Sequence, residues 1–98
     1  MAELRFAWDP RKDATNRRKH GVSFEEAQTV FSDDRGLFMA DPEHSSEGDR
    51  YVLIGLSSAI RVLVVVHCHR ESDEVIRIIS ARRATRHESR QYVERWTR

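Results

Sequence analysis

The chain has 98 residues, 17 of them Lys or Arg and 16 Asp or Glu, and a formal net charge of +1. This length predicts a single domain over residues 1–98. Cys68 is the only cysteine, which excludes an internal disulfide and indicates a reducing compartment. The N-terminal stretch lacks the apolar part of a secretory signal, and no apolar run approaches the length of a membrane span. We therefore expect a small cytoplasmic protein that does not enter a membrane.

Charged residues are unevenly distributed along the chain. Residues 10–22 carry five Lys or Arg and one acidic residue, and residues 82–98 carry six Arg and two Glu. Residues 23–58, by contrast, carry eight acidic and two basic residues. If the fold brings the two basic segments together, they form a surface that attracts phosphate groups. If it does not, they are the solvated faces of two separate helices, and the sequence leaves both alternatives open.

The N-terminal part predicts a short strand followed by a polar helix. Residues 4–8 alternate in the manner of a strand. Asp9-Pro10 is a favoured helix start, and Gly21 is a favoured helix end. Between them Ala14 is the only apolar residue, so the helix gains little from packing and its long basic side chains are available for binding. We expect Asn16, in the middle of this helix, to face solvent.

The rest of the chain predicts a second helix, four strands and a third helix. The second helix begins at S-x-x-E, residues 23–26, where we expect a capping box, and its apolar residues recur at helical spacing. Four strands are expected at 37–40, 51–56, 60–69 and 75–82. The last three follow one another on short loops and predict an antiparallel meander. A second box, T-x-x-E, caps the last helix. The order is β-α-α-β-β-β-β-α, an α+β fold with two N-terminal helices on one face of an antiparallel sheet.

The strand at 75–82 is the most informative element. Its β-branched residues point to both faces, which suits a buried central position. Arg77 and Arg82 interrupt the apolar run, and a central strand must supply each of them with a partner or a function. The functional interpretation is recognition of phosphate, or stabilisation of a charged transition state, by bidentate guanidinium groups. The alternative is an ion pair with the acidic segment. Lys12, Lys19 and His20 are weaker candidates for the same role.

Three consecutive residues, His67, Cys68 and His69, resemble a metal-binding cluster. Strand alternation, however, sends Cys68 to the opposite face, and no third ligand lies at a recognised spacing, so we expect no metal site. His67 could instead donate or accept a proton. The alternative is a hydrogen-bonded structural histidine, and pattern alone does not show whether His67 shares a face with Arg77. Glu88 is interpreted as a helix cap and not as a base.

Several common catalytic motifs are missing from the sequence. It contains no Walker motif, no G-x-G-x-x-G, no G-x-S-x-G and no H-E-x-x-H. Nucleotide hydrolysis, dinucleotide chemistry and serine or zinc proteolysis are therefore not expected.

The two ends of the chain together resemble a known family. The segment from Trp8 to Phe24 reads W-D-P-x-K-x-x-x-N-x-x-K-H-G-V-x-F, and the segment from Ile76 to Thr85 reads IRIISARRAT. Arg50-Tyr51 and the run before His67 continue the similarity. This pattern resembles the BrnT toxins of bacterial type II toxin–antitoxin pairs. The resemblance implies a RelE-like fold and a ribonuclease activity that arrests translation and growth.

The resemblance also implies a mechanism without metal or cofactor, in which the 2′-OH of the RNA attacks the adjacent phosphate. The catalytic residues would be Arg77 and Arg82, which stabilise the phosphorane, and His67 as an acid or base. The RNA-binding residues would be Lys12, Lys19 and Arg83. The implied partner is a BrnA-like antitoxin with a ribbon-helix-helix part, which forms a heterotetramer through an antitoxin dimer and alone contacts DNA. The alternatives are a non-catalytic RNA- or partner-binding domain of the same fold, and a DNA-binding regulator.

Overall fold

The computed structural model describes residues 4–41, 50–70 and 74–95, and the predicted order of elements is confirmed. The elements are β1 (Arg5–Ala7), α1 (Pro10–His20), α2 (Phe24–Thr29), a 3-10 turn η1 (Val30–Ser32), β2 (Leu37–Ala40), β3 (Arg50–Leu56), β4 (Val62–Arg70), β5 (Val75–Arg83) and α3 (Arg86–Glu94). Within these ranges no helix is long and apolar enough to cross a membrane.

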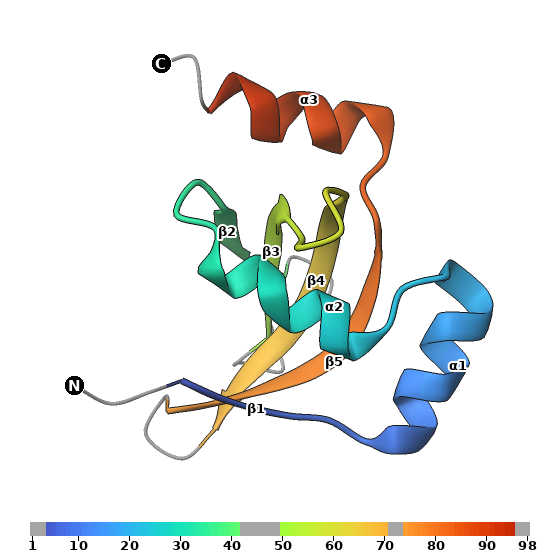
Figure 1. Cartoon of the computed structure of the whole chain (residues 1–98). Coiled ribbons are helices and arrows are strands. Elements are labelled where there is room, and N and C mark those ends of the chain that lie inside the picture. Colours follow the sequence, from blue (N-terminus) through green and yellow to red (C-terminus); the bar gives the residue numbers. More distant parts are fainter. Residues whose placement is uncertain (1–3, 42–49, 71–73, 96–98) are drawn as a thin grey trace.

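The five strands form one sheet in the order β1-β5-β4-β3-β2. Strands β3 to β5 form the predicted antiparallel meander, and β2 extends it by pairing antiparallel with β3. The first strand joins the sheet at the far edge, where it runs parallel to β5 through three residue pairs. The sheet is therefore antiparallel except at this edge, from which α1 and α2 carry the chain to β2 at the opposite edge (Figure 1). As predicted, β5 is an interior strand.

The three helices occupy different positions relative to the sheet (Figure 1). Side chains of α2 and its flanking residues form the main core with one face of β3, β4 and β5; its largest buried members are Phe24, Leu63, Ile78, Val22, Val30 and Val65. The first helix lies beside β5, and α3 lies at the end of the sheet where β5 finishes. The expectation that both N-terminal helices cover the face therefore holds for α2, whereas α1 packs against the side of the sheet.

Asn16 fixes α1 to the sheet and does not face solvent, which corrects the expectation from the sequence. Its side chain is buried, and Nδ2 donates to the carbonyls of Val22 at 2.9 Å and Ala81 at 2.7 Å. Its Oδ1 accepts from the N–H of Ala81 at 3.1 Å. Since β1 pairs with β5 only as far as Arg77, both backbone groups of Ala81 need another partner, and the amide supplies it.

Two of the three helix starts follow the predicted chemistry in full. Asp9 accepts from the N–H of Arg11 at 2.8 Å, and α1 ends at Gly21, whose φ of 69° is left-handed. At α3 both halves of the capping box with Thr85 are present. At α2 only one of the two hydrogen bonds of the predicted capping box is present. Ser23 accepts from the N–H of Glu26, but the carboxylate of Glu26 binds other residues and does not return to the cap.

Candidate functional site

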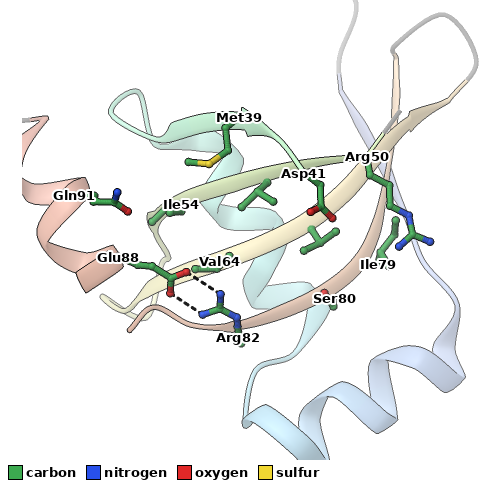
Figure 2. A pocket seen from close by; sticks show the side chains of 12 residues that line it. Met39, Asp41, Arg50, Ile54, Val64, Ile79, Ser80, Arg82, Glu88 and Gln91 are labelled. Carbon is green, nitrogen blue, oxygen red and sulfur yellow. Dashed lines mark hydrogen bonds and ion pairs between the residues drawn. The ribbon is translucent and has the colours of Figure 1, made fainter. Parts of the chain in front are cut away.

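The sheet face opposite α2, here called the open face, contains a pocket of about 490 Å³. We name it the arginine pocket. Its apolar floor comes from Met39, Val52, Ile54, Val64, Val66 and Ile79. Its polar rim is formed by Asp41, Arg50, Ser80, Arg82, Glu88 and Gln91. Figure 2 shows Glu88 and Gln91 reaching in from α3 at one end, with Asp41 and Arg50 at the other. The pocket therefore joins an apolar surface to charges of both signs.

A β-bulge in β5 brings the two predicted arginines to this face. Arg77 and Arg82 are five positions apart, and on a regular strand they would point to opposite faces. The pairing with β4, however, passes from His67 opposite Ile78 to Val66 opposite Ser80, so that Ile79 is an extra residue. Beyond the bulge the alternation is reversed, and Arg77 and Arg82 both lie on the open face.

Arg82 is held in place by a bidentate ion pair with Glu88. Its Nη1 donates to Oε1 at 2.7 Å and its Nη2 donates to Oε2 at 2.8 Å. Oε1 also accepts from the N–H of Thr85 at 2.8 Å, as part of the cap of α3. The hydrogen bonds from Arg82 are the main cause that lowers the pKa of Glu88 to about 2, and Glu88 in turn raises the pKa of Arg82. The expected ion pair thus exists, but its carboxylate comes from α3 and not from the acidic segment.

Arg50 is a third arginine of the open face, and the sequence interpretation did not weigh it. It lines the arginine pocket and lies opposite Cys68, which in turn lies opposite Arg77. Arg50 and Arg77 are therefore two strands apart in one row. Arg77 is half-buried and is not among the lining residues. Two signals for Arg50 were present in the sequence, its place beside a predicted strand and the Arg50-Tyr51 pair of the family resemblance. The register of the sheet was needed to place it on the open face.

His67 lies on the opposite face, which corrects the expectation that it joins the arginines. It is fully buried against the rings of Phe31, Phe38 and Tyr51. Burial lowers its pKa to about 4. Its Nδ1 lies 3.3 Å from the carbonyl of Val65, and Nε2 has no hydrogen-bond partner in the part of the chain that the structure describes. The structural interpretation therefore accounts for His67.

A second pocket, of about 300 Å³, adjoins the first one. We name it the α1 pocket. It is lined by Arg11, Lys12, Thr15, Asn16, Lys19, His20, Ile79 and Ser80. Ile79 and Ser80 line both pockets, so the bulge forms their common wall. The predicted RNA-binding residues Lys12 and Lys19 thus come together, and they lie next to the arginine pocket.

Arg83, the third predicted RNA-binding residue, lies elsewhere. It is paired with Leu63, whose side chain belongs to the α2 face. There it contributes to the lowered pKa of Glu26, for which a hydrogen bond from Arg61 is the larger cause. Arg83 is therefore separated by the sheet from Lys12 and Arg82.

The two connected pockets are suited to an anionic, extended ligand. Their basic side chains outnumber the two carboxylates, and arginine and lysine bind phosphate oxygens by charge-assisted hydrogen bonds. The apolar floor could accept the flat faces of bases. Within residues 4–41, 50–70 and 74–95, no group of three or more His, Cys, Asp or Glu side chains could hold a metal ion. The open face thus offers phosphate recognition, and it offers few candidates for proton transfer.

Comparisons with known proteins identify the family and the fold of the chain. A family model described as "Ribonuclease toxin, BrnT, of type II toxin-antitoxin system" matches residues 8–88. The fold is similar to the crystal structure of the Brucella abortus ribonuclease toxin BrnT, with a TM-score of 0.66, 24% identity, and coverage of 85% of this chain and 99% of that one. No curated protein matches significantly. Because the family model covers most of the sequence, the chain belongs to the BrnT family of ribonuclease toxins of type II toxin–antitoxin systems.

Proposed function

We propose that this chain is an endoribonuclease that cleaves RNA without a metal ion and thereby inhibits translation and growth. The single observation that supports it best is the arginine pocket, where the bulge of β5 places Arg82 on one face with Arg77 and Arg50. Membership of a ribonuclease toxin family makes RNA the expected substrate. The geometry adds a phosphate-binding face whose cations come from two strands.

In the proposed reaction the RNA supplies its own nucleophile. The 2′-oxygen forms a bond to the adjacent phosphorus, the bond from phosphorus to the 5′-oxygen breaks, and a 2′,3′-cyclic phosphate remains. The phosphorane carries more negative charge than the starting phosphate, so a fixed cation stabilises it more strongly than it stabilises the substrate. Arg82 meets this requirement because Glu88 and the cap of α3 hold its guanidinium group before RNA binds. Arg77 and Arg50 add positive charge along the same face.

Lys12 and Lys19 are proposed to bind the RNA backbone beside the scissile phosphate. Both line the α1 pocket, and this pocket shares Ile79 and Ser80 with the arginine pocket. A single strand could therefore cross the bulge of β5 with one phosphate near Arg82 and a neighbouring one near the lysines. Arg83 is left out of this path because it lies on the α2 face.

Membership of a type II family implies a protein antitoxin. We propose that it is a BrnA-like protein with a ribbon-helix-helix part, that its dimer binds two toxin chains in a heterotetramer, and that DNA is contacted only through the antitoxin. In such an assembly we expect both proteins in the cytoplasm. Coverage of the basic open face by the antitoxin would account for inhibition, because RNA and antitoxin would compete for one surface.

The decisive experiment is a cleavage assay in EDTA. The purified chain is incubated with a labelled single-stranded RNA, alone and with ribosomes, and the products are analysed for a 2′,3′-cyclic phosphate. The same sequence with 2′-deoxyribose throughout is the matched control, and it must stay intact because it lacks the nucleophile. Salt-sensitive binding of RNA without cleavage under all of these conditions would contradict the proposal and favour a non-catalytic RNA-binding domain.

A further inference from the structure

The 2′-OH must lose a proton when it attacks, and the structure limits the groups that can accept it. His67 is buried on the other face of the sheet. Glu88 has a pKa of about 2 and both of its oxygens are engaged by Arg82, so it is a weak base at neutral pH. Asp41 is buried at the far end of the arginine pocket from Glu88 (Figure 2). The arginines and lysines are cations. None of these groups fits the role of a base.

Among the described residues that line the two pockets, His20 is the remaining side chain of suitable chemistry. It is the last residue of α1, it is exposed, and it lines the α1 pocket together with Lys12, Lys19 and Ser80. Imidazole is the side chain that most often exchanges protons with a substrate. Asn16 anchors α1 to Ala81, the residue next to Ser80, so the helix that carries His20 is fixed beside the bulge.

On these grounds we propose that His20 is the proton-accepting catalytic residue of this ribonuclease. The inference rests on the proposed function, and it identifies a residue of the same groove. In the step, the imidazole takes the proton of the 2′-OH while the 2′-oxygen bonds to phosphorus. The electron pair of the broken P–O bond stays on the 5′-oxygen, which takes a proton from water. Arg82 stabilises the charge that develops between these two events.

Charged residues line the α1 pocket together with His20. Its own helix contributes Arg11, Lys12 and Lys19, and the neighbouring strand β5 contributes only the uncharged Ile79 and Ser80. The adjoining arginine pocket contains Arg82 in its pair with Glu88. Among the residues that the structure describes, no carboxylate lines the α1 pocket.

The test uses His20→Gln and, as a matched control, His87→Gln. His87 is an exposed histidine on α3 that lines neither pocket. Single-turnover cleavage of an RNA with a mapped cut site should fall by about 100- to 10,000-fold in His20→Gln. RNA affinity and the melting temperature should stay close to those of the unchanged chain, and His87→Gln should cleave normally. Imidazole added to His20→Ala should restore part of the rate.

The pH profile separates proton transfer from phosphate binding. If a neutral imidazole accepts the proton, the cleavage rate of the unchanged chain should fall at low pH, and His20→Gln should lose this part of the pH dependence. Equal loss of affinity and rate, without rescue by imidazole, would overturn the inference and make His20 a phosphate ligand. Normal cleavage by His20→Gln would also overturn it, while the ribonuclease proposal would stand. If the unchanged chain cuts no RNA, the proposed function fails and the inference fails with it.

Discussion

Among the described residues, two arginine–glutamate pairs hold a helix to the sheet region, one pair on each face of the sheet. Arg61 binds Glu26 of α2, and Arg82 binds Glu88 of α3. In both pairs the guanidinium group makes two hydrogen bonds to the carboxylate, and in both the pKa of the glutamate is lowered mainly by those bonds. The local chemistry is the same, so it does not by itself distinguish a structural pair from a functional one.

The two arginine–glutamate pairs differ in the residues and pockets around them. Glu26 also accepts from the hydroxyl of Ser57 at 2.7 Å, and Arg61 also donates to the carbonyl of Gly21 at 3.1 Å. These bonds tie the loop between β3 and β4 to the start of α2. The side chain of Arg61 is 25% exposed and lines neither the arginine pocket nor the α1 pocket. The side chain of Arg82 is 41% exposed and faces a pocket of about 490 Å³. We infer that the first pair stabilises the fold and that the second orients a cation for a ligand.

The matched substitutions Arg82→Gln and Arg61→Gln should distinguish the functional pair from the structural one, and we expect the largest effect of all the variants from Arg82→Gln. Arg82→Gln should lower single-turnover RNA cleavage by about 100- to 1,000-fold, because it removes a fixed charge from the developing phosphorane. Its free energy of unfolding should change little, since the pair is partly exposed. Arg61→Gln should leave cleavage unchanged and lower the free energy of unfolding by about 1 kcal/mol. Loss of stability without loss of cleavage in Arg82→Gln would reverse the assignment.

His67 extends the comparison, because a group on the α2 face should affect stability and not cleavage. Its pKa lies near 4 in the fold and near 6.5 when exposed, so the unfolded chain binds more protons between these values. Stability should therefore decrease as the pH falls from 6.5 towards 4, by up to about 3 kcal/mol, and be regained as the pH rises. Urea unfolding at several pH values measures this slope.

The substitution His67→Phe tests whether His67 causes this dependence of stability on pH. Phenylalanine suits the aromatic surroundings, and above pH 4.5 the free energy of unfolding of this variant should no longer depend on pH. His87 is exposed, so the control variant His87→Gln should retain the dependence of stability on pH. RNA cleavage at neutral pH should be unchanged in His67→Phe. A slope that persists in His67→Phe, or a folded variant that no longer cleaves RNA, would contradict the structural role of His67.

The fold could be predicted from the sequence because its signals are local. Caps at Asp9, Thr85 and Gly21 mark helix ends, and apolar periodicity marks the strands and α2. Alternation also placed His67 and Cys68 on opposite faces of β4, which the register confirms. The parallel direction of β1 has no such signal, since it arises from pairing with a strand distant in the sequence, with Arg5 opposite Val75.

The site was less predictable because it depends on contacts between distant residues. The extra residue in β5, Ile79, resembles any other β-branched strand residue, yet it decides that Arg82 joins Arg77 on the open face. Asn16 lies in a polar helix, so periodicity gave no sign that it binds Ala81, 65 positions away. The position of Arg50 on the open face could be recognised only from its pairing with Cys68. In each case the residue type was visible in the sequence and its neighbour was not.

Glu88→Gln should give the smallest effect and tests how firmly Arg82 is held. The pKa of Glu88, about 2, lies below that of an exposed glutamate, so the ionised carboxylate stabilises the fold at neutral pH. This contribution should disappear as the pH falls from about 4.5 towards 2, and it should stay below about 1 kcal/mol because solvent screens the pair. Glutamine can still cap α3. The free energies of unfolding of the unchanged chain and of Glu88→Gln, measured by acid unfolding, should therefore become equal at low pH.

The same substitution should act in the opposite direction on RNA. Removing the carboxylate takes a negative charge from beside the proposed phosphate position, so RNA affinity should rise and its dependence on salt should become steeper. Glu26→Gln is the matched control on the α2 face, and it should lower stability without changing RNA affinity. If Glu88→Gln and Glu26→Gln leave RNA affinity equally unchanged, Arg82 does not contact the bound strand, and the two arginine–glutamate pairs are both structural.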